Sequence, residues 1–201
     1  MTCIHDDPET FATTALAGYA AVYARHVRLI SGGVLRSTAT PPGKVALVVG
    51  GGSGHYPAFA GFVGPGLADA AVAGDVFASP SAHSVAHVGR LAHRGGGILL
   101  GFGKYAGDVM NFGLAAERLR AEGIAVRILP VTDDVASGPA DHPELRRGVA
   151  GDLIVFKMVG AAAEAGLALD DVERVAIKAN ANTVTFGVAF TGCTLPCATQ
   201  P

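Results

Sequence analysis

The sequence predicts an α/β fold in which helices flank an open, largely parallel (mixed) sheet. Short segments rich in Val, Ile and Leu alternate with helical patterns along the 201 residues. Glycine accounts for 28 residues, gathers directly after these apolar segments and follows no period. Repeated strand–loop–helix units of this kind join parallel strands and place their loops at the carboxyl ends of the strands. We therefore expect residues 1–201 to form one α/β domain.

The first forty residues predict a helix and a short strand. Asp6 and Asp7 precede Pro8, which is a typical helix start, and apolar residues at helical spacing extend the helix to about Arg25. The basic residues that follow indicate a solvated helix end. Residues 34–36 are expected to form a short strand before a Pro-Pro-Gly turn.

Four strand–loop–helix units account for most of the remaining chain. The expected strands are residues 44–49, 70–73, 98–102 and 125–131. The expected helices are residues 82–93, 109–122, 152–165 and 170–179, and residues 57–63 could begin another. Residues 183–193 alternate as a strand does.

Polar loops follow the four expected strands. Because parallel strands end at one edge of a sheet, these loops should form a single rim, where open α/β sheets bind ligands. The polar residues that the rim would carry are His55, Asp75, Ser79, Ser81, Lys104, Asp108, Asp133 and Asp134.

Charge and composition exclude several classes of partner. A net charge of −2, from 15 basic and 17 acidic residues without a basic stripe, argues against nucleic acid. No apolar run approaches the roughly 18 residues of a membrane span. Three cysteines cannot all pair, and the acidic N-terminus is not typical of a secretory signal, so we expect a reduced, cytoplasmic protein.

Residues 50–55, with the sequence GGGSGH, are the most informative loop. A buried strand that opens into such a turn leaves backbone N–H groups free to bind phosphate or another polar ligand. The loop lacks the Gly-Lys-Ser/Thr of a Walker motif, and Pro57 replaces the third glycine of a dinucleotide fingerprint. The pattern is explained equally well by a tight turn that packs a helix against a strand. His55 at its rim would suit a general base or a hydrogen-bond donor.

The other rim residues have structural explanations beside functional ones. Asp108 is a good helix cap, and Lys104 could neutralise a phosphate or reach solvent. Asp133 and Asp134 could bind a metal, cap a turn or be solvated, and the last two are favoured. No Cys/His set supports a zinc site, so we expect no metal.

Five segments, taken together and in this order, are more specific than any single loop. They are GKVALVVGGGSGHYPAFAGFVG, AGDVFASPS, GKYAGDVMNFGLAAERLRAEGI, VTDDVAS and RRGVAGDLIVFKMVGAAAEAG. In this combination the chain closely resembles the substrate-binding subunit of dihydroxyacetone (glycerone) kinases, from about Gly43 to Pro196.

The resemblance implies a chemistry. Members of this family phosphorylate a terminal hydroxyl of dihydroxyacetone or a similar short ketose. The phosphate comes from ATP (with Mg), or from a nucleotide recharged by a phosphotransfer system, on a separate nucleotide-binding domain or subunit. The resemblance makes His55 and Asp108 catalytic, with Asp108 as general base, and Gly52 and His55 hydrogen-bond donors to the ketose. The expected substrate-binding set is Gly52, Ser53, Gly54, His55, Ser79, Ser81, Lys104 and Asp108.

Two departures from the family pattern concern specificity. Family members often carry Glu where this chain has Tyr56. They often have Lys-Asn-Tyr where this chain has Gly103-Lys104-Tyr105, which displaces the lysine by one position. Both changes favour a relative that acts on a different short ketose, such as erythrulose.

The third departure concerns length. Family subunits continue into a second half with a histidine that bonds covalently to the substrate carbonyl, but no histidine follows His142 here. The chain therefore resembles the N-terminal half of such a subunit, is expected to be inactive alone, and would dimerise as the family usually does. The alternative is a non-catalytic ketose-binding or regulatory module that acts through a partner, and the absent histidine favours it.

Overall fold

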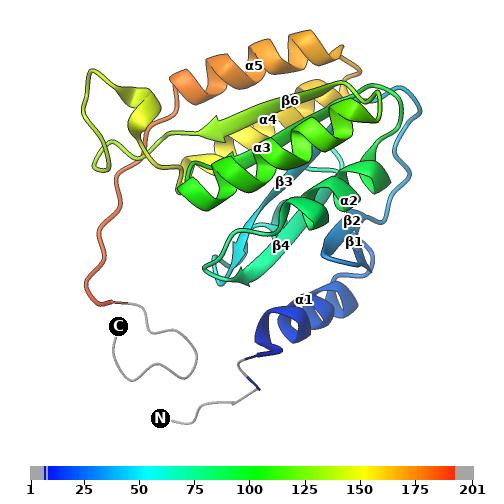
Figure 1. Ribbon diagram of the computed structural model, residues 1–201, viewed down its shortest axis with the longest axis horizontal. Coiled ribbons are helices and arrows are strands. Elements are labelled where there is room, and N and C mark those ends of the chain that lie inside the picture. The colour runs from blue at the N-terminus through cyan, green and yellow to red at the C-terminus, as the bar shows by residue number, and fades with distance from the viewer. Residues whose placement is uncertain (1–6, 8, 193–201) are drawn as a thin grey trace.

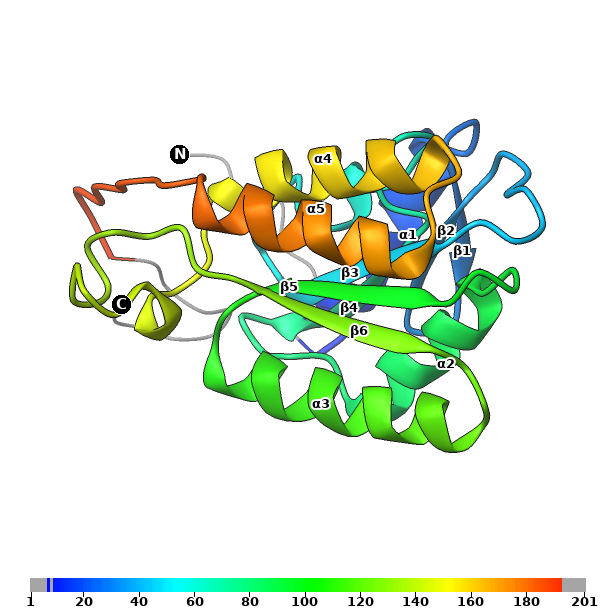
Figure 2. The same ribbon diagram turned by 90° about the horizontal axis from the view of Figure 1, so that it is seen from above.

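The computed structural model describes residues 7 and 9–192, in which a six-stranded sheet lies between two layers of helices (Figures 1 and 2). The strands are β1 (Val27–Ile30), β2 (Gly33–Arg36), β3 (Ala46–Ser53), β4 (Ala70–Val76), β5 (Ile98–Gly103) and β6 (Val126–Val131). Their order across the sheet is β1-β2-β4-β3-β5-β6. Strands β3 to β6 are parallel, whereas β1 and β2 run antiparallel to their neighbours. The predicted mixed, largely parallel sheet is confirmed.

Helices cover both faces of this sheet, as Figure 2 shows. The helical segments are α1 (Phe11–Val22), α2 (Ala82–Ala92), α3 (Ala106–Ala121), α4 (Gly151–Glu164) and α5 (Leu169–Ala181), with short 3-10 turns η1 (Ala60–Phe62) and η2 (Pro143–Leu145). Side chains alternate along β3, so Leu47 packs with α4 and α5 while Val48 packs with α2 and α3. Both faces are therefore apolar, as parallel strands require.

Near the N-terminus, both ends of the predicted helix differ from the structure, and one strand was not predicted. Helix α1 begins at Phe11 and ends at Val22, and two of the residues proposed as its start, Asp6 and Pro8, lie outside the described residues. Strand β1 was not predicted, because only Val27 of its four residues is buried. It pairs with β2 across a turn in which Gly32 has φ +78°, a conformation that glycine tolerates.

Two further predictions were wrong in type. The proposed helix over residues 57–63 is a turn with one short 3-10 segment, η1. The proposed strand over residues 183–193 is absent from its described part, 183–192, where Thr185 makes a single bridge to Asp134. The alternating apolar side chains Val184, Phe186, Val188 and Phe190 are 62–95% exposed, so no surface of the described chain covers them.

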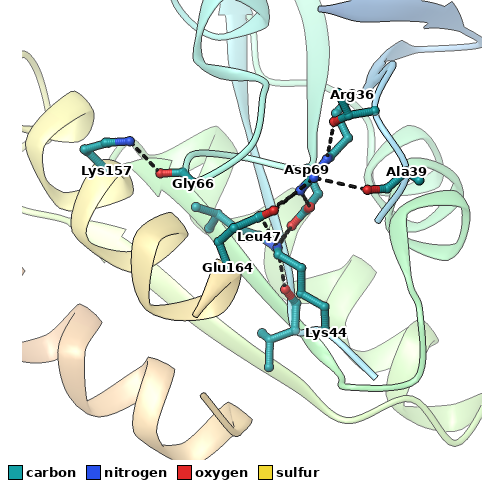
Figure 3. Close-up of polar contacts among 10 residues, drawn as sticks. Arg36, Ala39, Lys44, Leu47, Gly66, Asp69, Lys157 and Glu164 are labelled. Carbon is teal, nitrogen blue, oxygen red and sulfur yellow. Dashed lines mark hydrogen bonds and ion pairs between the residues drawn. The ribbon is translucent and has the colours of Figure 1, made fainter. Parts of the chain in front are cut away.

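A buried ion-pair network joins the amino ends of β3 and β4 to β2 and α4 (Figure 3). Asp69, which is 1% exposed, accepts hydrogen bonds from Lys44 Nζ at 2.6 Å and Arg36 Nη1 at 3.0 Å. Its Oδ2 also accepts the backbone N–H of Leu47 at 2.9 Å. Glu164, at the end of α4, accepts two further bonds from Arg36 at 2.7 and 3.0 Å. The network satisfies every carboxylate oxygen of Asp69.

Candidate functional site

A cavity of about 510 Å³ opens beyond the carboxyl ends of β3 and β5. This is the edge where the polar loops were expected to meet. Its lining residues are Gly50, Gly51, Gly52, Gly54, His55, Tyr56, Pro57, Ala58, Phe59, Phe62, Gly103, Tyr105, Asp108, Gly148, Val149, Ala150, Asp152 and Leu153.

The loop after β3 supplies one wall of the cavity. Gly54 has φ +100°, and a Cβ there would lie 2.9 Å from the Phe77 ring, so only glycine fits this turn. The turn presents His55 at the exposed mouth, where its ring lies 5.2 Å from that of Phe77, centroid to centroid. The predicted residues Gly52, Gly54 and His55 all line the cavity.

Asp108 supplies the opposite wall from the first turn of α3. The helix begins at Ala106, three residues before the predicted start, so Asp108 is not its cap and points instead to the cavity. Its side chain is 8% exposed, and Oδ1 has no hydrogen-bond partner. Burial raises the pKa of the Asp108 carboxyl, an effect that the Ser79 hydroxyl, the residue's own backbone and His55 partly offset.

Four predicted ligands do not line the cavity. Ser53 donates to the carbonyl oxygen of Gly74 at 2.7 Å, and Ser81 caps α2 by accepting the backbone N–H of Ser84 at 3.1 Å. Ser79 lies next to Asp108, and its hydroxyl accepts a hydrogen bond from Asn111 at 3.3 Å. The Nζ of Lys104 donates to the carbonyl oxygen of Glu144. These side chains have partners within the chain, whereas Asp108 Oδ1 has none.

The remaining rim aspartates accept hydrogen bonds from backbone N–H groups and do not line the cavity. Asp75 is exposed and accepts the backbone N–H of Val76, while Asp134 closes a turn by accepting that of Ala136. Asp133 is fully buried, and its two oxygens accept the backbone N–H groups of Val149 and Gly151, both at 2.8 Å. Asp133 is therefore not solvated, which was one of the two favoured interpretations. It anchors the start of α4 from outside the helix, whose N-cap residue is Ala150.

Asp152, in the first turn of α4, is a cavity residue that the sequence did not reveal. Its side chain is 6% exposed, and Oδ1 has no partner. Burial raises the pKa of its carboxyl well above the usual value, and the negative charges of Asp133 and Asp108 add to this effect. An aspartate at a predicted helix start looks like an ordinary capping residue, so no local signal distinguished it.

The described part of the chain offers neither a candidate metal site nor a helix that could span a membrane. Among residues 7 and 9–192, no group of three or more His, Cys, Asp or Glu side chains is placed to hold a metal ion. None of the helices over the same residues has both the length and the apolar character needed to cross a membrane.

The fold and the cavity define an α/β protein with a candidate ligand site at the carboxyl ends of its parallel strands, lined by glycines, one histidine and two buried aspartates. Residues 17–201 match the Dak1 domain. The chain therefore belongs to the Dak1 domain family, as the resemblance indicated.

Two relatives of this chain have names that specify a kinase or a kinase subunit. The chain is 58% identical over 201 residues to L-erythrulose 1-kinase of Mycolicibacterium smegmatis, covering 100% of this chain and 35% of the relative. It is 46% identical over 184 residues to the dihydroxyacetone-binding subunit DhaK of PTS-dependent dihydroxyacetone kinase 2 of Listeria innocua, covering 90% and 55%. The chain thus spans about a third to a half of these relatives' length.

A solved structure matches the whole fold. The native form of the dihydroxyacetone kinase of C. freundii superposes with a TM-score of 0.90 at 36% identity, covering 100% of this chain and 37% of that one. The same enzyme, in complex with AMP-PNP and Mg²⁺, superposes with a TM-score of 0.82 over 91% of this chain.

Proposed function

We propose that this chain is the N-terminal part of the substrate-binding unit of a kinase. The kinase transfers phosphate to a terminal hydroxyl of a short ketose, dihydroxyacetone or erythrulose. One observation carries the proposal: the buried Oδ1 of Asp108 has no partner and faces a cavity that also holds Gly52 and His55. The names of the relatives, which include both an erythrulose kinase and a dihydroxyacetone-binding subunit, support this substrate class.

In this proposal Asp108 is the general base. The hydroxyl oxygen of the ketose attacks the phosphorus of the nucleotide, the bond to the nucleoside diphosphate breaks, and Asp108 takes the hydroxyl proton. A carboxylate whose pKa is raised by burial is a stronger base than an exposed one. Gly52 and His55 lie at the same cavity and would hold the ketose oxygens in place.

We place the phosphoryl donor on another domain or subunit. The GGGSGH loop lacks the lysine of a Walker motif. Residues 1–201 alone are therefore expected to bind ketose without transferring phosphate. ATP with Mg²⁺, or a nucleotide recharged by a phosphotransfer system, would come from that partner. A homodimer and a cytoplasmic location remain predictions.

Phosphate transfer by the whole gene product that carries this chain tests the proposal. The protein is supplied with ATP, Mg²⁺ and, where its own sequence lacks one, a nucleotide-binding subunit, and transfer to dihydroxyacetone and L-erythrulose is measured. Asp108→Asn should lower kcat by about 10²–10⁴-fold, the usual contribution of a general base. Asp75→Asn, an exposed aspartate outside the cavity, is the matched control and should leave kcat unchanged. No transfer to either ketose by the unaltered protein would refute the proposal.

A further inference from the structure

Asp152 is the second buried carboxylate of the cavity, and the proposed reaction gives it no role. Asp152 is 94% buried and lines the cavity together with Asp108. Its Oδ1 has no hydrogen-bond partner within the described chain. Leaving such an oxygen unsatisfied is unfavourable, so a group that supplied a hydrogen-bond donor would be bound favourably.

The backbone around Asp152 holds its carboxylate in place. Asp133 binds the N–H groups of Val149 and Gly151, which fixes the residues immediately before Asp152. Thr185 also donates its hydroxyl to Asp133 and secures this anchor from the other side. Asp152 therefore starts from a rigid position and loses little conformational freedom when a ligand binds.

Gly103 provides the space that the carboxylate occupies. A Cβ at position 103 would lie 3.0 Å from Asp152 Oδ2 and 2.8 Å from the carbonyl oxygen of Gly148. A larger side chain at 103 would therefore push against the carboxylate. Gly103 and Asp152 both line the cavity, so a side chain at position 103 would reduce the space that the carboxylate has at this wall.

The charged groups around Asp152 do not neutralise it. The groups that act most on its ionisation are Asp133 and Asp108, and both are acidic. The guanidinium of Arg147 instead lies over the ring of Tyr105, 5.6 Å from its centroid. A neutral hydrogen-bond donor, such as a hydroxyl, suits this position better than an anion, which three carboxylates would repel.

We propose that Asp152 is a specificity-determining residue that binds a hydroxyl which dihydroxyacetone lacks. Dihydroxyacetone has two hydroxyls, whereas a four-carbon ketose such as erythrulose has three. Asp108 takes the reacting hydroxyl, and Asp152 accepts a hydrogen bond from the additional one. This inference rests on the proposed ketose kinase function. The 58% identity to an L-erythrulose 1-kinase, against 46% to a dihydroxyacetone-binding subunit, agrees with it.

The unpaired Oδ1 of Asp152 determines how strongly the site should discriminate between three-carbon and four-carbon ketoses. A site built to bind a substrate hydroxyl rejects the analogue that lacks it, because its polar group then stays buried without a partner. Replacing the carboxylate should therefore lower affinity for the four-carbon ketose and leave the three-carbon ketose nearly unaffected. The effect should appear mainly in KM, since Asp152 does not touch the proton that is transferred.

The test compares Asp152→Asn with the unaltered whole gene product under the transfer assay described above. Rates are measured with L-erythrulose, D-erythrulose and dihydroxyacetone. We expect kcat/KM for at least one erythrulose to fall by on the order of 10–100-fold, with less than a threefold change for dihydroxyacetone. Asp75→Asn is again the control and should change neither value. Calorimetric titration of each ketose gives a second readout that is independent of phosphate transfer.

The outcomes separate this inference from the proposed function. Transfer by the unaltered protein to none of the three ketoses overturns both proposals. Transfer to dihydroxyacetone and to an erythrulose, with Asp152→Asn changing kcat/KM equally for all of them, overturns only the specificity role and leaves the kinase function standing. Transfer to dihydroxyacetone alone likewise overturns only the specificity role. If Asp152→Asn does not fold, Asp152→Ser is used, and an unchanged ratio of erythrulose to dihydroxyacetone affinity in that variant also overturns the specificity role.

Discussion

Asp69 and Asp152 are both buried aspartates, and they lie at opposite edges of one sheet. Asp69 precedes β4 at the amino edge, is 1% exposed, and accepts bonds from Arg36, Lys44 and the backbone of Leu47. Asp152 lies at the carboxyl edge, is 6% exposed, and has an oxygen without a partner. The two aspartates are therefore almost equally buried, but both oxygens of Asp69 have hydrogen-bond partners, whereas one oxygen of Asp152 has none.

This difference in hydrogen bonding distinguishes a buried aspartate that stabilises the fold from one that is available to bind a ligand. Removing one partner of a buried ion pair is strongly destabilising, because the other charge then stays buried without compensation. A buried carboxylate without partners is destabilising as it stands, and natural proteins retain such groups mainly at functional sites. Three predictions, taken from the largest effect to the smallest, test this distinction.

Removing Asp69 should have the largest effect on stability. Asp69→Ala leaves the buried Arg36 and Lys44 with Glu164 as their remaining carboxylate partner, at 2.7 and 3.6 Å. We therefore expect a loss of about 3 kcal/mol in the free energy of unfolding, the lower end of the range for breaking a buried ion pair. Urea denaturation measures it. Arg90→Ala removes an ion pair with Glu122 whose side chains are both 40% exposed, and should cost less than about 1 kcal/mol. Equal losses in the two variants would contradict the distinction.

Asp152→Asn should instead raise stability at neutral pH. The folded-state pKa of Asp152 is raised, so the folded protein holds its proton more tightly than the unfolded chain does. Stability from this group is therefore present below the unfolded value of about 4 and is lost as the pH rises through the folded value. Asn carries no charge at any of these pH values, and the gain at pH 7 should be about 1–3 kcal/mol.

The pH dependence of the stability gain from Asp152→Asn distinguishes an effect of the buried charge from an effect of packing. The gain from Asp152→Asn should shrink as the pH falls toward 4, because the native carboxyl is then neutral. Thermal unfolding between pH 4 and pH 8 measures the difference. Glu164, in the paired network, behaves in the opposite way: its hydrogen bonds from Arg36 lower its pKa, so its contribution is lost as the pH falls. A gain from Asp152→Asn that stays constant with pH would show that burial of charge is not the cause.

Ser81→Ala should have the smallest of the three effects. Its hydroxyl caps α2 and does not line the cavity, so we expect a loss of about 1 kcal/mol in stability and no change in KM for either ketose. Ser81→Asn, which retains a capping oxygen, is the matched control and should restore most of that stability. A change of more than threefold in KM would return Ser81 to the binding set that the sequence predicted.

Much of the fold could be predicted from local pattern. Strands β3 and β5 are apolar segments that run into glycines, and β4 and β6 are short segments rich in Ala, Val, Ile and Leu. Strand β1 escaped prediction because it is four residues long and mostly exposed. The alternating segment 183–192 was misassigned because alternation predicts a strand only where a neighbouring strand offers hydrogen bonds, and a single bridge is present.

Part of the site could also be predicted from local sequence pattern. Gly52, Gly54, His55 and Asp108 lie at or shortly after the carboxyl ends of β3 and β5, so topology brings them to one cavity. Ser53, Ser81 and Lys104 also follow strand ends, but their side chains bind neighbouring groups of the chain. Proximity to a strand end places the backbone at the rim, whereas the direction of each side chain depends on partners that local sequence does not specify.

The sequence by itself determined the parallel sheet, the glycine loop with His55 and the position of Asp108, because these depend on periodicity and on backbone freedom within a few residues. Only the tertiary structure decided which buried carboxylates are paired. Arg36 and Lys44 reach Asp69 from 33 and 25 positions away. Asp152 comes from a different element than Asp108 and meets it only at the cavity. Hydrogen bonds act over about 3 Å, so the partners of a side chain are set by the folded chain and not by its neighbours in sequence.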